Sequence, residues 1–181
     1  LYRSVGWLAK EKNLTSEEDI LEIIREKPFE WKWDGENFKI YYKGEDLSKI
    51  IRTNEMGNEA SKIGNMPKIR EILTLWQRDY LKKIKNGLVL EGRDSGTVVF
   101  PSANLKIYIT ANLKIRTERR AKELGEDPRK VLNSIIERDK RDSERAYSPL
   151  KIPKDAFLID TSNLSPNDAL LKIISLFIKV R

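Results

Sequence analysis

The fold class of this 181-residue chain depends on the stretch Asn86-Gly-Leu-Val-Leu-Glu-Gly-Arg-Asp-Ser-Gly-Thr-Val-Val-Phe-Pro101. It contains the short apolar run Leu88 to Leu90, and a second run, Leu105 to Ile109, follows it. Gly, Pro and Asn bound both runs, which is typical of fully buried strands in a parallel sheet. Both are therefore predicted as buried strands, and Phe157 to Ile159 is predicted as a third short apolar strand.

The residues after the first predicted strand carry candidate chemistry. Gly92, Arg93 and Asp94 stand at its carboxyl end. In open α/β sheets ligands bind at that edge, and a glycine there lets the backbone approach a ligand while Arg and Asp offer opposite charges. The same residues also fit a surface turn with an ordinary salt bridge, so both interpretations stay open at this point.

Helix signals alternate with the predicted strands. The predicted helices have apolar residues at helical spacing, and most begin at a capping residue or a proline. They cover residues 1–12, 15–27, 53–63, a segment from Pro67 that Asn86 and Gly87 end, 112–125, 127–145 and a last helix from Ser165. The last is expected to turn Leu170, Ile173, Ile174 and Phe177 toward the core. This alternation predicts an α/β protein with a parallel sheet and helices on both faces.

Residues 28–47 have a different period. Aromatic and charged residues alternate on either side of a turn at Asp34 and Gly35, which predicts a β-hairpin in a small antiparallel subdomain. The alternating apolar residues are Phe29, Trp31, Trp33, Phe38, Ile40 and Tyr42. With the lysines between them they would suit stacking on single-stranded nucleic acid, but the buried face of a small sheet is the favoured interpretation.

Composition excludes several classes of chemistry. The chain has no Cys and no His, so thiolate nucleophiles, disulfides, Cys/His zinc sites and triads with a histidine base are excluded. An excess of 35 basic over 28 acidic residues gives a net charge of +7, which favours anionic partners such as nucleotides, nucleic acid or a membrane surface. The lack of cysteine and of a long apolar run predicts a soluble, cytoplasmic protein.

Several polar residues are ambiguous on their own. The run from Glu137 to Arg145 fits a solvated helix face, yet Arg138, Asp142 and Arg145 are spaced by four and three residues and share one face. Ser61 and Arg70 lie near the junction of two predicted helices and fit ordinary surface.

Taken together, these blocks resemble the bacterial cytidylate kinases, which are nucleoside monophosphate kinases of the P-loop class. Any single block would be weak, but several in the right order span essentially the whole chain. The matching blocks are Leu-Tyr-Arg at 1–3, Ile-Arg-Thr at 51–53, Gly-Asn-Glu-Ala-Ser-Lys-Ile at 57–63, Pro-Lys-Ile-Arg at 67–70, Gly-Arg-Asp-Ser-Gly-Thr-Val-Val-Phe-Pro at 92–101, Glu-Arg-Asp-Lys-Arg-Asp-Ser-Glu-Arg at 137–145, Ser-Pro-Leu at 148–150, Asp-Ala at 155–156 and Ile-Asp-Thr-Ser at 159–162.

The resemblance implies one (d)CMP kinase domain over residues 1–181. Its fold would be a P-loop kinase-type parallel sheet flanked by helices, with an antiparallel insert for the monophosphate at residues 28–66 and a lid at 120–142. The implied activity is transfer of a phosphoryl group from ATP, with Mg²⁺, to CMP or dCMP, giving CDP or dCDP in pyrimidine metabolism. The implied partners are these small nucleotides. A monomer is expected, without a membrane or nucleic acid as partner.

The resemblance also implies roles for individual residues. Ser61, Arg70 and Asp94 would recognise cytosine, whose amino donor suits a carboxylate beside donating groups. The pentose would contact Arg138 and Asp142. The acceptor phosphate would be held by Arg3, Arg93 and Arg145, with Arg93 and Arg145 catalytic, because phosphoryl transfer relies on positioning and cationic stabilisation. ATP would meet lid-side arginines, and no residue is assigned to a metal. The lid-side set is Arg116, Arg119, Arg120 and Arg141.

One family feature is missing from this sequence. The family begins with a strand and a Gly-x-x-x-x-Gly-Lys-Ser/Thr loop that cradles the donor phosphates. None of the nine glycines here is followed by lysine. The expectation is an N-terminally truncated kinase that lacks the first strand and the P-loop and transfers phosphate poorly. The alternatives are a natural remnant that binds without catalysis, a basic nucleotide- or nucleic-acid-binding module, and a kinase for another monophosphate.

Overall fold

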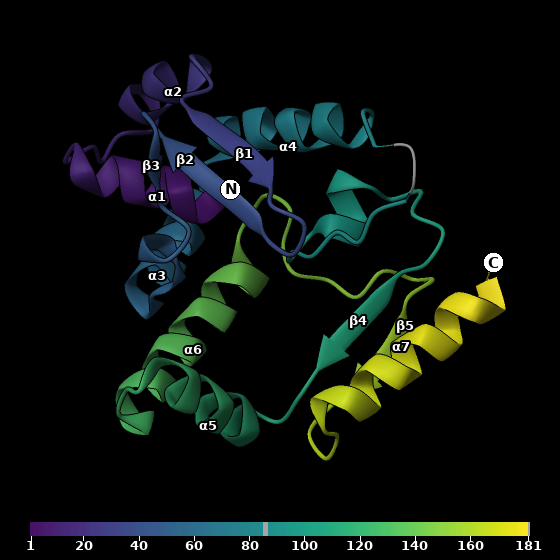
Figure 1. Cartoon of the computed structure of the whole chain (residues 1–181). Coiled ribbons are helices and arrows are strands. Elements are labelled where there is room, and N and C mark those ends of the chain that lie inside the picture. The colour runs from purple at the N-terminus through teal and green to yellow at the C-terminus, as the bar shows by residue number, and fades with distance from the viewer. Residues whose placement is uncertain (85–86, 181) are drawn as a thin grey trace.

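The computed structural model describes residues 1–84 and 87–180 (Figure 1). It confirms a mixed α/β fold with a parallel sheet flanked by helices and a small antiparallel sheet. The helices are α1 (Tyr2–Glu11), α2 (Glu17–Arg25), α3 (Asn54–Ile63), α4 (Pro67–Leu81), α5 (Leu113–Leu124), α6 (Pro128–Glu144) and α7 (Pro166–Val180), with a 3-10 turn at Ile50–Arg52 and a π-helical turn at Ser95–Val99. The strands are β1 (Phe29–Trp33), β2 (Phe38–Tyr42), β3 (Glu45–Asp46), β4 (Ile107–Thr110) and β5 (Phe157–Asp160).

Side-chain caps start several helices where the sequence predicts them. Ser16, Thr53, Asn112 and Asp127 each accept a hydrogen bond from a backbone amide of the first turn. Gly125 ends α5 in the left-handed conformation, at φ 67°. These caps fix where α3, α5 and α6 begin, and so where their polar side chains point.

Helix α4 is shorter than predicted. Its regular part ends at Leu81, and bonds of the i,i+3 type continue as Lys83 N to Tyr80 O and Ile84 N to Leu81 O, both at 3.1 Å. Such bonds tighten the last turn of a helix and take up its free carbonyls. The predicted stop at Asn86 lies outside the described residues.

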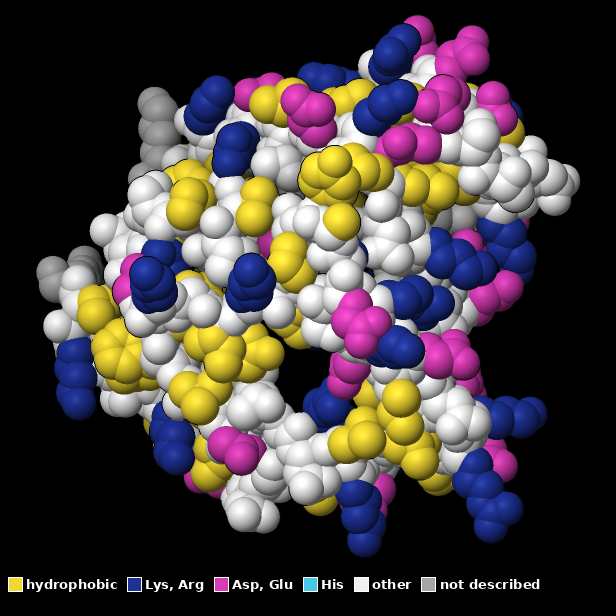
Figure 2. Space-filling view, turned by 180° about the vertical axis from the view of Figure 1, so that it is seen from behind, with side chains coloured by type: hydrophobic (Ala, Val, Ile, Leu, Met, Phe, Trp, Pro, Cys, Tyr) yellow, Lys and Arg dark blue, Asp and Glu magenta, His cyan; other side chains and the backbone are white. Residues whose placement is uncertain are grey.

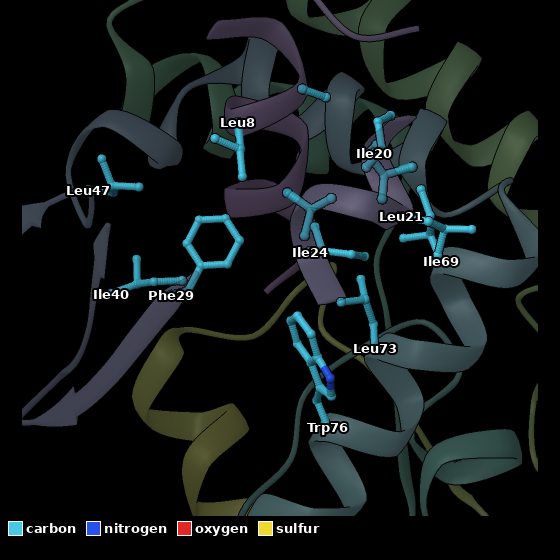
Figure 3. Close-up of a cluster of buried hydrophobic side chains, with 13 residues drawn as sticks. Leu8, Ile20, Leu21, Ile24, Phe29, Ile40, Leu47, Ile69, Leu73 and Trp76 are labelled. Carbon is cyan, nitrogen blue, oxygen red and sulfur yellow. The ribbon is translucent and has the colours of Figure 1, made fainter. Parts of the chain in front are cut away.

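The main hydrophobic core lies in the N-terminal half, between α1, α2, α4 and the hairpin (Figure 3). Strand β1 pairs antiparallel with β2, with Phe29 opposite Tyr42 and Trp31 opposite Ile40. Phe29 and Ile40 are buried in this core, and Trp31 packs against Trp76 of α4 at 6.1 Å between ring centroids. The interpretation of the hairpin face as core is therefore confirmed near its base.

The far end of the hairpin departs from this interpretation. Trp33 is 57% exposed and Phe38 is 47% exposed. The two rings pack on each other at 5.2 Å, and Phe38 also touches the ring of Tyr80. They lie beyond the cluster of buried residues, so the alternating pattern alone overestimated their burial.

The parallel sheet is smaller and more open than predicted. Strands β4 and β5 pair in parallel from Ile107 opposite Phe157 to Thr110 opposite Asp160. The predicted strand Leu88 to Leu90 is wrong, because these residues have no regular structure and Val89 is 96% exposed. The predicted full burial of the strand at Leu105 to Ile109 is also wrong, because Ile109 is 56% exposed. A parallel strand is buried when helices cover both faces and strands pair along both edges, and in the described residues β4 pairs only with β5.

Helix α7 forms where its apolar spacing predicts it, but its apolar side chains do not face a core. Leu170, Ile174 and Phe177 are exposed, Phe177 by 55%. Figure 2 shows apolar side chains gathered on the surface among charged ones. None of the described helices combines the length and the apolar character that crossing a membrane requires.

Candidate functional site

A buried ion pair joins α4 to the segment before the π-helical turn. Arg70 Nη2 donates to Asp94 Oδ2 at 2.6 Å, and Arg70 Nη1 donates to the carbonyl of Gly64 at 3.2 Å. Both side chains are buried, and the ring of Tyr2 lies 5.2 Å from the Arg70 guanidinium carbon. Asp94 thus pairs across the fold, and the alternative of a surface turn with a local salt bridge is wrong.

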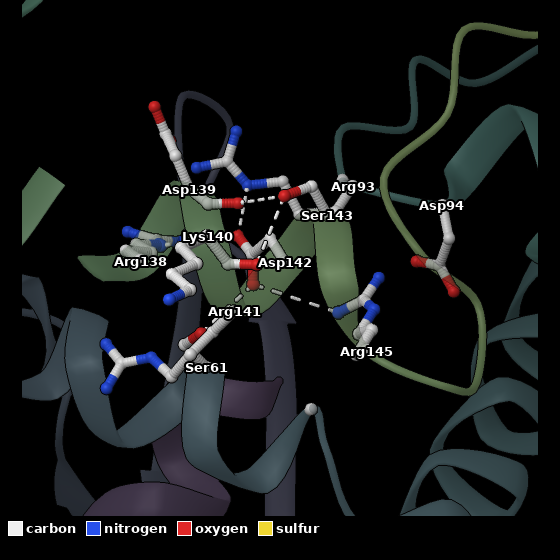
Figure 4. Close-up of polar contacts among 12 residues, drawn as sticks. Ser61, Arg93, Asp94, Arg138, Asp139, Lys140, Arg141, Asp142, Ser143 and Arg145 are labelled. Carbon is white, nitrogen blue, oxygen red and sulfur yellow. Dashed lines mark hydrogen bonds and ion pairs between the residues drawn. The ribbon is translucent and has the colours of Figure 1, made fainter. Parts of the chain in front are cut away.

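A second buried carboxylate, Asp142, faces three guanidinium groups (Figure 4). Arg93 Nε lies 3.1 Å from Oδ2 and Arg138 Nε 3.7 Å from it, while Arg145 Nη1 lies 3.9 Å from Oδ1. Ser61 of α3 donates its hydroxyl to Oδ1 at 3.0 Å. Arg138 and Arg145 reach the same carboxylate because they are spaced by four and three residues around Asp142 on α6 and its C-cap.

Arg3 joins this cluster from α1. Its Nη1 donates to the carbonyls of Ile51 and Thr53, both at 2.8 Å. The guanidinium groups of Arg3 and Arg138 meet over Gly57 of α3. A Cβ atom at Gly57 would lie 3.2 Å from Arg138 Nη1 and 3.3 Å from Arg3 Nη2, so glycine leaves room for both groups.

Positive charge exceeds negative charge in this cluster. Burial, followed by the nearby Arg93, lowers the pKa of Arg138 to about 10. Burial, followed by Arg70, lowers the pKa of Arg145, and burial likewise lowers the pKa of Arg3. These arginines stay positively charged at neutral pH, but their burial and their closeness to one another make the charged form less favourable. An anion placed among them would relieve that strain.

One cavity of about 420 Å³ collects these groups. All eight residues that the resemblance implies for the substrate line it, which are Arg3, Ser61, Arg70, Arg93, Asp94, Arg138, Asp142 and Arg145. Its volume falls in the range of small-molecule sites. Several lining residues also have buried polar atoms that make no hydrogen bond within the protein, namely Tyr2 Oη, Arg70 Nε, Gln77 Oε1, Arg138 Nε, Asp142 Oδ2 and Arg145 Nη2. The cavity can therefore supply hydrogen bonds to a polar, anionic ligand.

Tyr2 and Gln77 are among the lining residues that were missed from the sequence. Tyr2 precedes Arg3 on α1, and burial raises the pKa of its phenol. Gln77 lies seven residues after Arg70, on the same face of α4. The i, i+7 spacing from Arg70 was the available signal for Gln77, whereas nothing in the sequence pattern distinguished Tyr2 from a core aromatic.

The four lid-side arginines do not gather in this cavity. Each is held by another partner. Arg116 pairs with Asp139 at 2.7 Å, and Arg119 donates to the carbonyl of Thr161 at 2.7 Å. Arg120 pairs with Glu123 at 2.8 Å, and Arg141 donates to the Asn58 side chain at 3.0 Å.

A second, more open cavity of about 640 Å³ lies at the carboxyl ends of β4 and β5. Its lining includes Asn112, Lys114 and Ser162. This is the edge of a parallel sheet where ligands generally bind. Within the described residues, no group of three or more Asp or Glu side chains is arranged to hold a metal ion.

Comparison with known proteins shows similarity over nearly the whole chain. The family model described as cytidylate kinase matches residues 1–179. The chain is 38% identical to the cytidylate kinase of Neisseria meningitidis serogroup A over 187 aligned residues, covering 99% of this chain and 83% of that protein. It is 40% identical to the cytidylate kinase of Thermosipho melanesiensis, covering 96% and 80%, and 36% identical to that of Aeromonas salmonicida, covering 97% and 78%.

Proposed function

This chain belongs to the cytidylate kinase family and is therefore a nucleoside monophosphate kinase, and from that premise we propose that the cavity lined by its arginines binds CMP or dCMP for phosphorylation by ATP. The observation that carries the proposal is the convergence of Arg70, Asp94, Asp142 and their partner arginines on one cavity. Together with Arg3, these residues come from four separate parts of the sequence. A cavity that pairs a buried carboxylate with a surplus of arginines suits a ligand with both a polar base and a phosphate.

The base is proposed to lie at the Arg70–Asp94 pair. Cytosine presents an amino donor beside two acceptors, so the Asp94 carboxylate would accept from the amino group while guanidinium groups donate to the acceptors. Arg70 Nε is a buried donor without a hydrogen-bond partner, as this arrangement requires, and the Ser61 hydroxyl is proposed as the third group that recognises the base. Uracil has an acceptor where cytosine has the amino group, so it would face the carboxylate unfavourably.

The pentose and phosphate are proposed to occupy the Asp142 side of the cavity, with Ser61 close by. Arg138 and Asp142 would contact the pentose, while Arg3, Arg93 and Arg145 would hold the acceptor phosphate. In phosphoryl transfer the charge on the transferring group spreads over its equatorial oxygens. Arg93 and Arg145 would stabilise that charge, which is their proposed catalytic role.

ATP is the phosphate donor of this family, and we propose the cavity at the ends of β4 and β5 for it. Arg119 borders that region through Thr161, and the segment 120–142 would act as the lid that brings Arg116, Arg120 and Arg141 nearer. Mg²⁺ commonly binds through nucleotide phosphates with few protein ligands. Such binding needs no cluster of three acidic ligands, and the described residues form none.

The insert for the monophosphate is proposed to span residues 28–66. We further propose that the protein is a cytoplasmic monomer.

The competing proposal is a nucleic-acid-binding module, favoured by the net charge of +7 and the exposed Trp33 and Phe38. Titrating CMP, UMP and a short single-stranded oligonucleotide at two salt concentrations separates the two. The kinase proposal expects CMP to bind more tightly than UMP, with weak oligonucleotide binding. Tight oligonucleotide binding that falls steeply with salt, without preference among mononucleotides, would favour the module instead.

A further inference from the structure

The turn that follows Asp94 is held by a second arginine of α4, Arg78. Its Nη2 donates to the carbonyl of Val98 at 2.7 Å, and its Nε donates to the carbonyl of Val99 at 3.0 Å. These carbonyls lie at the end of the π-helical turn, where bonding within the turn leaves them free. A positive charge at this end also suits the direction of the peptide dipoles.

The turn behaves as a closed unit with Asp94 at its start. The Asp94 carbonyl accepts from the amides of Val98 at 2.9 Å and Val99 at 3.1 Å, and Phe100 N donates to Ser95 O at 2.8 Å. A shift at the end of the turn is therefore transmitted to Asp94. Helix α4 holds both ends, because Arg70 bonds the Asp94 carboxylate and Arg78 bonds the last carbonyls.

We propose that Arg78 is a positioning residue for cytosine recognition. It is absent from the lining of the cavity, so it would act through the turn and not by touching the nucleotide. Its two donors fix the turn against α4, and the turn sets where Asp94 presents its carboxylate to the base. This inference rests on the proposed role of Asp94 in recognising the cytosine amino group.

The test measures CMP and UMP affinity of Arg78→Met, Arg78→Lys and the unmodified chain by titration calorimetry. Arg78→Met is expected to weaken CMP binding about tenfold, which is about 1.4 kcal/mol. UMP binding should change less, because uracil does not use the Asp94 carboxylate as an acceptor, so the preference for CMP falls. Arg78→Lys should be intermediate, since an ammonium group lacks the planar fork that reaches two carbonyls.

Hydrogen exchange adds a direct measure of the turn. The amides of Val98, Val99 and Phe100 should exchange faster in Arg78→Met. Lys82→Met removes a positive charge one turn further along, from an exposed side chain that pairs with Asp79, and should change neither the exchange of these amides nor the preference for CMP. An equal loss of CMP and UMP binding, or a lower melting temperature with the preference unchanged, would show a purely structural role and overturn the inference.

Asp94→Asn separates this inference from the proposed function. If Asp94→Asn keeps the preference for CMP, the proposed cytosine recognition fails and the role of Arg78 fails with it. If Asp94→Asn loses the preference while Arg78→Met keeps it, only the role of Arg78 fails. Should Arg78→Met not fold, the preference of Arg78→Lys decides the matter by the same criterion.

Discussion

Asp142 balances only part of the positive charge that surrounds it. Its single carboxylate faces Arg93, Arg138 and Arg145, and the guanidinium of Arg3 lies beside that of Arg138 over Gly57. Like charges held this close disfavour the empty cavity and favour a bound anion. The residues that bind ligand are therefore expected to affect stability in opposite directions according to their charge.

Asp142→Asn should be strongly destabilising. The amide keeps the shape and the contact with Ser61 but leaves three guanidinium groups without their counter-charge. We expect the free energy of unfolding to fall by about 3 kcal/mol in chemical denaturation, as for a broken buried ion pair. Asp139 lies on the same helix as Asp142 but forms a more exposed ion pair, with Arg116 of α5. Asp139→Asn should therefore lower the free energy of unfolding by less than about 1 kcal/mol. Equal effects of the two changes would contradict the assigned charge balance.

Arg138→Met should behave in the opposite way. Burial, followed by the nearby Arg93, lowers the pKa of Arg138 from its usual value to about 10, so its charge is disfavoured in the fold at every pH below about 10. Removing the charge should leave the free energy of unfolding at pH 7 unchanged or slightly higher, while CMP binding weakens at least about tenfold. Calorimetry and thermal unfolding of the same sample measure both. A large loss of stability with CMP binding intact would refute this assignment.

At the scale of elements, the sequence predicted features that depend on neighbouring residues better than features that depend on packing between distant segments. Ser16, Thr53, Asn112 and Asp127 cap helices where their side chains and the following apolar spacing indicated. Those signals act within four residues, so the sequence holds all of their information. The strand predicted at Leu88 to Leu90 failed because a strand requires a pairing partner elsewhere in the chain, which a local apolar run does not specify.

For the candidate site, too, the sequence showed the local spacing of residues but not which distant residues meet. The spacing of Arg138, Asp142 and Arg145 on one helix face was visible in the sequence, but their meeting with Arg93 depends on how α6 packs. Tyr2 was missed for the same reason, since only the fold brings its ring to Arg70. The eight implied residues came from the family resemblance, which carries the tertiary information that spacing lacks.

Gly6→Ala should disturb the packing of α1 on α3. A Cβ atom at Gly6 would lie 2.8 Å from Glu59 Cβ and 3.1 Å from the Glu59 carbonyl carbon, which is closer than packed atoms allow. Alanine favours a helix by about 1 kcal/mol over glycine, but overpacking costs about 1 to 3 kcal/mol. We expect a net loss of stability and weaker CMP binding, because α1 carries Arg3. An increase in melting temperature with unchanged CMP affinity would contradict the close contact.

At the scale of the whole molecule, charge and apolar surface are unevenly placed. The arginine-rich cavity lies between α1, α3, α4 and α6, close to the buried core of the N-terminal half. The parallel sheet and α7 instead expose apolar side chains, such as Leu158 at 60%. The molecule thus joins a well-packed half, which positions the nucleotide cavity, to a sheet with little cover.

Salt should separate the phosphate contribution from that of the base. CMP carries a phosphate toward the surplus arginines, whereas cytidine lacks it. Raising the salt concentration from 50 to 500 mM should therefore weaken CMP binding clearly more than cytidine binding, because exposed charge interactions are screened within about 10 Å at 0.1 M. Titration of both ligands at the two concentrations measures the difference. Parallel salt dependence would place the phosphate away from the arginine cluster.

The most direct test of the central claim is a crystal structure of the chain with CMP. The account predicts the cytosine amino nitrogen within about 3.2 Å of an Asp94 carboxylate oxygen, with the phosphate among Arg3, Arg93 and Arg145. CMP bound in the cavity at the ends of β4 and β5, or with its base turned away from Asp94, would contradict the account.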